Sequence, residues 1–244
     1  HQTGEMLMKI EDVLLAEKPD VLLVYGDTNS TIAGALAASK LHIPVAHVEA
    51  GLRSYNMRMP EEQNRVLTDH ISHWLFCPTQ TAVDNLKKEG IVQGVQLTGD
   101  VMLDSVLHFL EVARRNPQKA AIFEALGIAP KQYRLATLHR AETTDGGLEA
   151  IVRIFRAFEQ LPQRVLIPIH PRTRKLAEQA IAQEGFHNIQ LIDPVGYLEM
   201  LLLTSNACQV LTDSGGLQKE AWFMEVPCIT LRKETEWVET LDGN

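Results

Sequence analysis

The chain has 244 residues, of which 45% are hydrophobic and 22% are charged, and this composition excludes a disordered or collagen-like protein. Its formal net charge is −8 and no run rich in Lys and Arg occurs, so we expect no nucleic-acid partner. The longest apolar runs, such as residues 197–204, are far too short to span a bilayer, so we expect no membrane partner.

The three cysteines, Cys77, Cys208 and Cys228, are widely spaced among apolar neighbours. Such spacing, without His or Cys partners, argues against a disulfide framework and against a zinc site. We therefore expect buried thiols, no metal and a cytoplasmic protein. The chain begins at His1, without Met, and ends in a turn-like sequence, so we expect an internal piece of a longer protein.

The first part of the chain alternates helices with short apolar strands. Helical periodicity covers residues 5–18, and the next run, 21–25, is apolar on both faces, as in a buried parallel strand. The later elements expected in this part are a helix over 28–40, a strand over 43–48, a helix opening at Glu61-Glu62, a strand over 74–77, a helix over 79–89 and a strand over 94–97.

Residues 99–130 contain two helical patterns and no strand, which is typical of a connector between domains. The alternation then restarts, with strands expected over 133–138, 164–169, 189–192, 209–211 and 227–231, and helices over 147–160, 171–184, 197–204 and 216–223. Strands that alternate with helices predict an α/β fold with right-handed, parallel, doubly wound sheets. We expect an N-terminal Rossmann-like domain over 1–105, a helical connector over 106–130 and a C-terminal Rossmann-like domain over 131–244.

Polar residues gather directly after the predicted strands. Asp27 and Glu49 follow strands of the first half, whereas His139, His170 and the Ser214-Gly215-Gly216 segment follow strands of the second half. Ligands of open parallel sheets bind beyond the carboxyl ends of the strands. If the two sheets face a central cleft, carboxylates on one wall oppose an anion site on the other.

The segment Ser214-Gly215-Gly216 joins a strand to a helix, and two glycines let the backbone approach a ligand. Backbone N–H groups and the positive end of the helix then favour a phosphate, and Glu220 lies about a turn further on the ligand side. The alternative is a plain Ser N-cap with an exposed Glu.

The acidic candidates also have structural alternatives. Asp27 suits the N-cap of a helix, and Glu61, after Pro60, suits a first helical turn. Glu49 is expected close to the sheet, where a carboxylate needs partners, and such groups cluster at functional sites. His139 and His170 have the alternative of satisfied structural histidines.

Four segments carry a resemblance to a known family: residues 47–54 (HVEAGLRS), 59–65 (MPEEQNR), 138–142 (LHRAE) and 212–220 (TDSGGLQKE). They are similar, in the same order, to the non-hydrolysing UDP-N-acetylglucosamine 2-epimerases. The resemblance implies a GT-B-like fold of two Rossmann-like domains, a UDP-sugar substrate, a homodimer, and no metal or redox cofactor. It further implies a role in supplying precursors of cell-surface polysaccharides.

The resemblance assigns roles to individual residues. It implies that the catalytic residues are Asp27, Glu49, Glu61 and His139. It implies that the substrate-binding residues are Ser214, Gly215, Gly216, Glu220, Arg53, Arg65, His170 and Arg58. The implied reaction interconverts UDP-GlcNAc and UDP-ManNAc through elimination of UDP to a 2-acetamidoglucal and re-addition with inversion at C2.

Two features depart from many members of the family. Residues 235–239 (TEWVE) stand where many members have Thr-Glu-Arg-Pro-Glu, and the loop over 53–60 is short. Both resemble the branch that acts on UDP-2,3-diacetamido-2,3-dideoxyglucuronate. Arg58 is then the candidate partner of the uronate carboxylate, and the alternative is a solvated loop arginine. A GT-B glycosyltransferase and a non-catalytic nucleotide-sugar sensor are the competing functional hypotheses.

Overall fold

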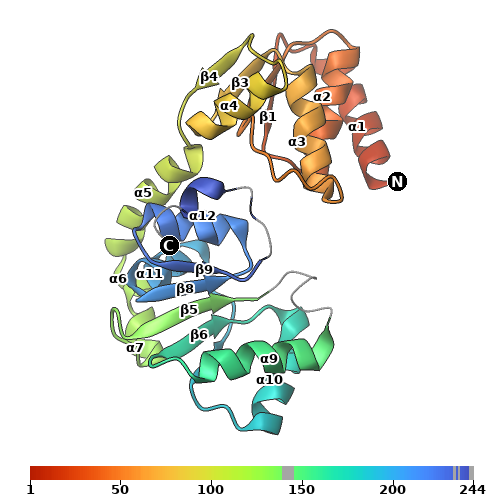
Figure 1. Cartoon of the computed structure of the whole chain (residues 1–244). Coiled ribbons are helices and arrows are strands. Elements are labelled where there is room, and N and C mark those ends of the chain that lie inside the picture. The colour runs from red at the N-terminus through yellow and green to blue at the C-terminus, as the bar shows by residue number, and fades with distance from the viewer. Residues whose placement is uncertain (139–145, 233–234, 236, 242–244) are drawn as a thin grey trace. The chain divides into compact units, whose positions relative to one another are not determined.

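The computed structural model describes residues 1–138, 146–232, 235 and 237–241. The chain divides into two compact units, His1–Val101 and Met102–Asn244 (Figure 1). Each unit is built around one parallel β-sheet with helices packed on it, and we describe each by itself.

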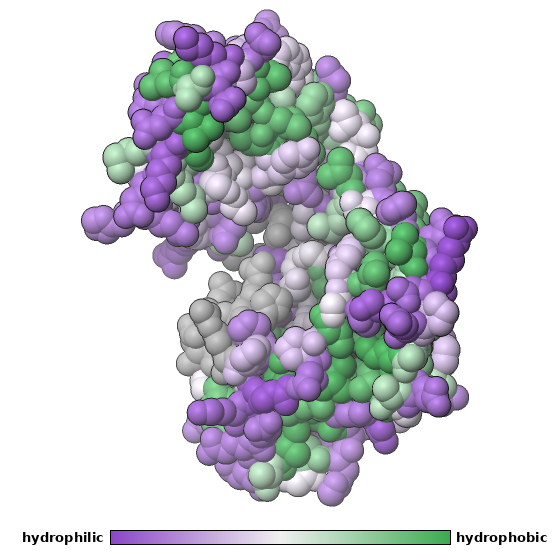
Figure 2. Space-filling model, turned by 180° about the vertical axis from the view of Figure 1, so that it is seen from behind, coloured by the Kyte–Doolittle hydropathy of each residue, from purple (hydrophilic) through white to green (hydrophobic). Residues whose placement is uncertain are grey.

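The N-terminal unit has a four-stranded parallel sheet in the order β1-β2-β3-β4. Strand β1 forms one edge of this sheet, and its Leu23 and Tyr25 side chains are exposed, so the expectation of a strand buried on both faces is wrong here. Apolar side chains are visible among the polar ones on the surface of this unit (Figure 2). The elements of this unit are α1 (Gln2–Glu17), β1 (Leu22–Tyr25), α2 (Asn29–Lys40), β2 (Val45–Val48), α3 (Pro60–Ile71), β3 (Trp74–Cys77), α4 (Gln80–Lys88) and β4 (Val95–Leu97).

The Ala-rich sequence of α2 explains how this unit packs. Ala35, Ala37 and Ala38 are buried in one apolar cluster with Leu14 of α1 and Val24 of β1. Small side chains let the helix backbone approach the sheet closely, so α2 lies between α1 and the strands as a tightly packed layer.

The C-terminal unit has a five-stranded parallel sheet in the order β7-β6-β5-β8-β9. The chain starts in the middle at β5, winds outward to β7, and returns to β8 on the other side of β5. This reversal between β5 and β8 is the switch point at which doubly wound sheets bind ligands. The elements are α5 (Val101–Arg114), α6 (Pro117–Ala120), α7 (Ile122–Leu126), β5 (Tyr133–Thr137), α9 (Gly147–Glu159), β6 (Arg164–Pro168), α10 (Pro171–Glu184), β7 (Ile189–Ile192), α11 (Tyr197–Asn206), β8 (Gln209–Thr212), α12 (Gly215–Phe223), β9 (Cys228–Thr230) and η1 (Val238–Leu241).

The segment before β5 forms three helices where the sequence indicated two. The side chain of Asn116 accepts hydrogen bonds from the backbone N–H groups of Gln118 and Lys119, and Pro117 occupies the first turn, so a new short helix begins there. Helix α5 packs Val106 and Leu110 into an apolar cluster with residues of α11.

All nine strands expected from the sequence lie within two residues of the strands of the two sheets, so the α/β, GT-B-like class is confirmed. Among the described residues, no helix combines the length and the apolar character needed to cross a bilayer.

Candidate functional site

A cavity of about 390 Å³ opens at the carboxyl end of the C-terminal sheet, at the switch point between β5 and β8. Four residues that the sequence predicted for substrate binding line it: His170, Ser214, Gly216 and Glu220. The other lining residues are Thr137, Leu138, Pro168, Pro194, Val195, Met200 and Leu217. The structure therefore brings these candidates together in one apolar hollow with a few polar groups, the usual composition of a small-molecule site.

The turn from β8 into α12 is fixed by hydroxyl groups. Thr137 and Thr212 are register partners, and their Oγ1 atoms are 2.5 Å apart, while the backbone N–H of Ser214 donates to Thr212 Oγ1 at 2.9 Å. Ser214 is the N-cap of α12, and its Oγ accepts from the backbone N–H of Leu217 at 3.4 Å. The start of a nine-residue helix is thus held against the cavity.

The two glycines at this helix start differ in their surroundings. Gly215 is buried and does not line the cavity, whereas Gly216 does. A Cβ added to Gly216 would meet only Ser214 Oγ, at 3.9 Å, so the space over this backbone is open. A phosphate oxygen can approach the N–H groups there as it does at other helix N-termini.

Glu220 lines the cavity from α12, about one turn past the start of that helix, and is half-buried. Burial raises the pKa of its carboxyl, although a hydrogen bond from the Tyr197 hydroxyl and the charge of Lys219 both act to lower it. Burial and the neighbouring Glu220 also raise the pKa of Tyr197 to about 12. The Tyr197–Glu220 contact was not foreseen, although Tyr197 follows β7 at the same carboxyl edge of the sheet, which is the signal that identifies it.

The two candidate histidines have different outcomes. His170 is exposed at the start of α10, where its carbonyl accepts from the backbone N–H groups of Thr173 and Arg174 at 2.9 and 3.1 Å. His139, together with the rest of its motif from Arg140 to Glu142, lies outside the described residues.

Asp27 and Glu49 lie at the carboxyl edge of the N-terminal sheet. They follow the neighbouring strands β1 and β2, which pair in register up to Tyr25 and Val48. A Cβ added to Gly26 would lie 3.4 Å from Glu49 Oε2, so the Glu49 carboxylate is positioned over the turn that carries Asp27. The structure therefore brings these two predicted catalytic carboxylates together.

Arg65 links this edge of the sheet to α3. Its Nη2 forms an ion pair with Asp27 Oδ2, and its Nη1 donates to Glu62 Oε2 at 2.9 Å. The Asn64 side chain adds a hydrogen bond to the Asp27 carbonyl at 2.9 Å. Arg65 is 2% exposed and both of its ion-pair partners lie in this unit, so it orients Asp27 from the side of α3.

The adjacent acids at the start of α3 behave differently. Glu62 is 1% exposed and accepts hydrogen bonds from the backbone N–H and the hydroxyl of Ser54, the backbone N–H of Tyr55 and Arg65. Glu61 is exposed, and its carboxylate has no hydrogen bond or ion pair within the described ranges. The Glu62 carboxylate therefore fixes the loop at Ser54 and Tyr55, whereas the Glu61 carboxylate can bind a ligand.

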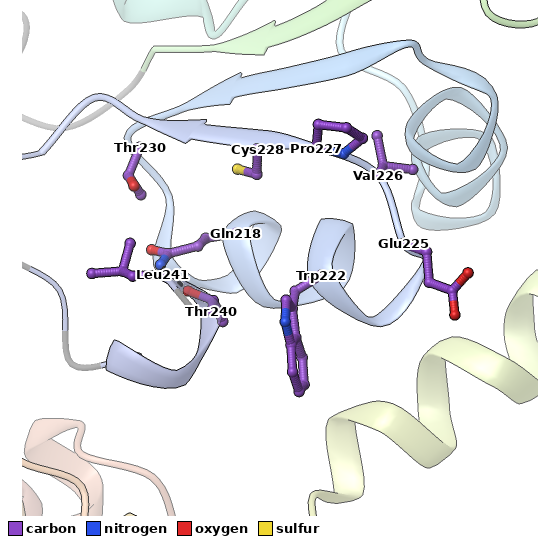
Figure 3. Close-up of a pocket in the computed structure, with 9 residues that line it drawn as sticks. All are labelled: Gln218, Trp222, Glu225, Val226, Pro227, Cys228, Thr230, Thr240 and Leu241. Atoms are coloured by element: carbon purple, nitrogen blue, oxygen red, sulfur yellow. Dashed lines mark hydrogen bonds between the residues drawn. The ribbon is translucent and has the colours of Figure 1, made fainter. Parts of the chain in front are cut away.

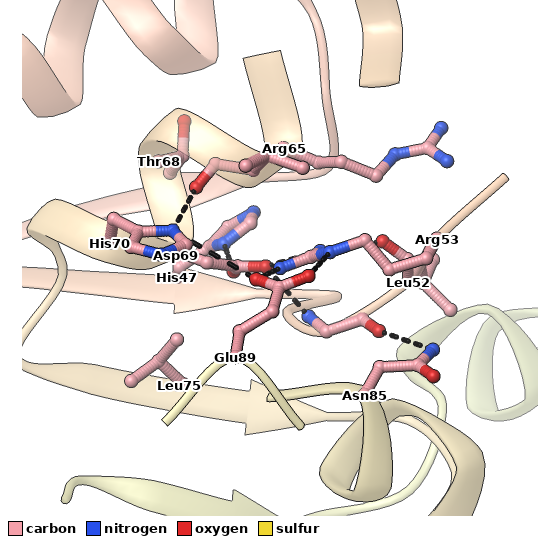
Figure 4. Close-up of polar contacts among 12 residues, drawn as sticks. His47, Leu52, Arg53, Arg65, Thr68, Asp69, His70, Leu75, Asn85 and Glu89 are labelled. Carbon is pink, nitrogen blue, oxygen red and sulfur yellow. Dashed lines mark hydrogen bonds and ion pairs between the residues drawn. The ribbon is translucent and has the colours of Figure 1, made fainter. Parts of the chain in front are cut away.

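The two arginines of this loop also differ in burial and in partners. The Arg53 guanidinium is buried and donates to Asp69 Oδ2, to both oxygens of Glu89 and to the Leu52 carbonyl, each at 2.7 Å (Figure 4). Burial opposes its charge, but these carboxylates outweigh burial and raise its pKa. Arg58 is exposed, and within the described part of the chain its side chain has no ion pair. The substrate-binding role of both arginines stays a prediction.

A second hollow of about 180 Å³ lies between α12, β9 and η1 (Figure 3). It shares no lining residue with the cavity at the switch point. The side chain of Gln218 donates to Thr240 Oγ1 and accepts from Thr235 Oγ1 at 3.0 Å, which holds the last described segment against α12. No group of three His, Cys, Asp or Glu side chains suited to a metal ion occurs among the residues with described positions.

Comparison with known proteins gives one consistent family. The family model described as UDP-N-acetylglucosamine 2-epimerase matches residues 1–244. A Methanococcus maripaludis protein named UDP-N-acetylglucosamine 2-epimerase homolog is 58% identical, over 99% of this chain and 68% of its own. The UDP-2,3-diacetamido-2,3-dideoxy-D-glucuronate 2-epimerase of Pseudomonas aeruginosa is 54% identical, over 97% of this chain and 65% of its own.

Among solved structures, the Methanocaldococcus jannaschii UDP-GlcNAc 2-epimerase in complex with UDP-GlcNAc and UDP has a TM-score of 0.86 and 48% identity, over 99% of this chain and 68% of that one. The chain thus spans about two thirds of the length of the relatives that it matches. The match covers the whole chain, at identities well above those at which only a fold is shared. The chain belongs to the UDP-N-acetylglucosamine 2-epimerase family.

Proposed function

We propose that the protein is a non-hydrolysing UDP-N-acetylglucosamine 2-epimerase that interconverts UDP-GlcNAc and UDP-ManNAc. The observation that carries the proposal is the cavity at the β5/β8 switch point, lined by Ser214, Gly216 and Glu220, in a chain of this family. A helix start with open space over Gly216 suits a diphosphate, and a half-buried carboxylate one turn further suits the ribose hydroxyls.

The carboxylates of the N-terminal unit supply the proton chemistry. The C2 proton of the sugar is not acidic, because no carbonyl is adjacent to it in the ring. Elimination breaks the C1–O bond with its electron pair leaving on UDP, while a carboxylate takes the C2 proton and a C1–C2 double bond forms. Re-addition returns a proton to the opposite face of C2, and a UDP oxygen attacks C1.

Asp27, Glu49 and Glu61 are the proposed carboxylates for these steps. Carboxylates also stabilise the oxocarbenium-like charge that develops at C1 when the anomeric bond breaks. The ion pair with Arg65 orients the Asp27 carboxylate, whereas the exposed Glu61 has no competing partner in the described structure. His139 is proposed to assist the departing UDP.

Incubation of the intact protein with UDP-GlcNAc in D₂O, followed by NMR, tests the reaction. We expect UDP-ManNAc together with deuterium at C2, because the proton removed exchanges with solvent before it returns. Accumulation of free sugar, or transfer of the sugar to an acceptor, would instead indicate a hydrolase or a GT-B glycosyltransferase. Tight binding without turnover would indicate a nucleotide-sugar sensor.

The second candidate substrate is UDP-2,3-diacetamido-2,3-dideoxyglucuronate. The 54% identity to the Pseudomonas aeruginosa enzyme favours it, as does the exposed Arg58, three residues before Glu61. If Arg58 binds the C6 carboxylate, Arg58→Ala lowers kcat/KM for the uronate more than for UDP-GlcNAc, by about 1.5–3 kcal/mol. Lys88 is an exposed cation on α4, so Lys88→Ala is the control. Equal losses of kcat/KM on both sugars in Arg58→Ala would exclude a role of Arg58 in selecting the sugar.

We also propose that the protein acts as a homodimer in the cytoplasm and supplies precursors of cell-surface polysaccharides. These proposals rest on the resemblance of its motifs to the family. Analytical ultracentrifugation of the intact protein tests the first of them, with a dimer as the expected species and a monomer at micromolar concentration as the contrary result.

A further inference from the structure

One buried carboxylate connects the two turns that carry Asp27 and Glu49. Asp69, in the last turns of α3, is 1% exposed, and its Oδ1 lies 2.7 Å from His47 Nδ1 (Figure 4). The other ring nitrogen of His47 lies 2.8 Å from the carbonyl oxygen of Gly26, the residue before Asp27. Asp69 Oδ2 accepts from the backbone N–H of Gly51, two residues after Glu49, at 3.1 Å.

The chemistry of the partners explains how the imidazole of His47 is held. The carbonyl of Gly26 can only accept, and Asp69 accepts as a carboxylate that Arg53 also pairs at 2.7 Å. Both ring nitrogens of His47 therefore face acceptor oxygens, one on the carboxylate of Asp69 and one on the Gly26 carbonyl. Arg53 is paired by Asp69 and by Glu89, so charges of opposite sign lie together in this network.

The turn around Glu49 needs such support. Glu49 has a φ of +68°, in the left-handed region that residues other than glycine rarely adopt. A residue in this conformation persists only where its surroundings over-determine it. Here the backbone N–H of Gly26 donates to the Val48 carbonyl at 3.0 Å, that of Ala50 to the Phe76 carbonyl at 3.1 Å, and that of Gly51 to Asp69. Only the last of these bonds depends on a side chain.

We propose that Asp69 is a positioning residue for the epimerase reaction, which holds the Asp27 and Glu49 turns in register through His47 and the Gly51 N–H. The proposal rests on the proposed function. Residues 61, 65 and 69 lie four apart on one face of α3. The same helix therefore presents Glu61, pairs Asp27 through Arg65, and anchors the turns of Asp27 and Glu49 through Asp69.

The kinetic test compares three variants of the intact protein. Asp69→Ala removes both anchors, and we expect kcat to fall about a hundredfold, as for a misplacement of reacting groups by about 1 Å. KM stays within about threefold, because the nucleotide cavity is built by other residues. For Asp69→Asn we expect a kcat within about fivefold of the wild-type value. Its amide oxygen still accepts from Gly51, its amide N–H donates to His47 Nδ1, and Nε2–H still donates to Gly26.

Glu89→Ala is the matched control, because it removes the other carboxylate of Arg53 without touching either turn. We expect its kcat to stay within about threefold of wild type after correction for the folded fraction. If Asp69→Ala keeps its kcat, or if Asp69→Asn is as inactive as Asp69→Ala, the proposal is wrong.

Amide hydrogen exchange tests the positioning without any substrate. The Gly51 amide should be protected in wild type, Asp69→Asn and Glu89→Ala, and should exchange much faster in Asp69→Ala. Equal protection in Asp69→Ala would overturn the positioning role even in an active enzyme. Absence of epimerisation by wild type, with the expected exchange pattern, would overturn the proposed function alone.

Discussion

The two units of the chain use buried polar groups in different ways. In the N-terminal unit, charged side chains such as Arg53, Glu62, Arg65 and Asp69 are almost fully buried and bond one another and the turns after the strands. In the C-terminal unit, the predicted ligand site is a cavity whose main polar feature is the start of α12. We infer that the first unit orients carboxylates for proton transfer and that the second binds a nucleotide through backbone geometry.

The largest expected effect is a loss of kcat on substitution of Glu61, in contrast to a loss of stability on substitution of its neighbour Glu62. Glu61→Gln should lower kcat about a hundredfold or more, the usual scale for a general acid or base, with an unchanged Tm. Glu62→Gln should lower the free energy of unfolding by about 1–3 kcal/mol, because an amide N–H₂ would face donors. Steady-state kinetics and thermal unfolding of both variants check this. A normal kcat for Glu61→Gln would exclude that residue from the mechanism.

A smaller effect is expected at Gly216, where stability and affinity should move in opposite directions. Gly216→Ala should raise the free energy of unfolding by up to about 1 kcal/mol, because the site is helical and has room for a Cβ. UDP affinity, measured by calorimetry, should fall about tenfold, as for a lost hydrogen bond to a charged group. Gly34→Ala in α2, where a Cβ makes ordinary contacts at 3.5 Å, is the control and should leave UDP affinity unchanged. A Gly216→Ala variant with full affinity would show that no phosphate lies over this backbone.

The smallest expected effect is a pH dependence of binding through Glu220. Burial raises the pKa of this carboxyl in the folded protein, so its contribution to stability is fully present below the ordinary Glu pKa and is lost as the pH rises through the raised value. Ribose hydroxyls bind the ionised form, so nucleotide binding releases a proton. UDP-GlcNAc affinity should therefore rise as the pH rises from the ordinary Glu pKa through the raised value, and should level off above it.

UDP-GlcNAc suits this measurement because its diphosphate has no group that titrates in that range. Glu220→Gln should flatten the pH dependence, since the amide stays neutral throughout. A dependence that persists unchanged in Glu220→Gln would assign it to another group.

The fold followed from the sequence because the strands are short apolar runs that end at Gly, Pro or polar residues, whether they are buried in the sheet or exposed at its edge, as β1 is. The candidate site of the C-terminal unit followed for the same reason, since Ser214 and His170 come directly after strands. Tyr197 lies further from its strand, at the start of α11 after the loop that follows β7, and its contact with Glu220 depends on how α11 and α12 pack.

Asp69 was harder to foresee. It lies inside a helix, and its partner His47 lies 22 residues earlier in a strand, so no local pattern joins them. Its place four residues after Arg65 and eight after Glu61, on one face of the predicted helix, was the available signal. For Glu61 and Glu62, the sequence cannot tell which acid faces inward, because the path of the irregular loop at Ser54 and Tyr55 determines where backbone donors point.

The division of labour between the units is tested most directly by measuring two quantities on two variants. For Glu61→Gln and Glu220→Gln of the intact protein, UDP affinity is measured by calorimetry and C2 deuterium incorporation into saturating UDP-GlcNAc by NMR. Glu61→Gln should keep UDP affinity and lose deuterium incorporation, whereas Glu220→Gln should lose affinity and retain most of the incorporation at saturation. If both variants lose the same quantity, the two units do not divide binding and proton transfer in this way.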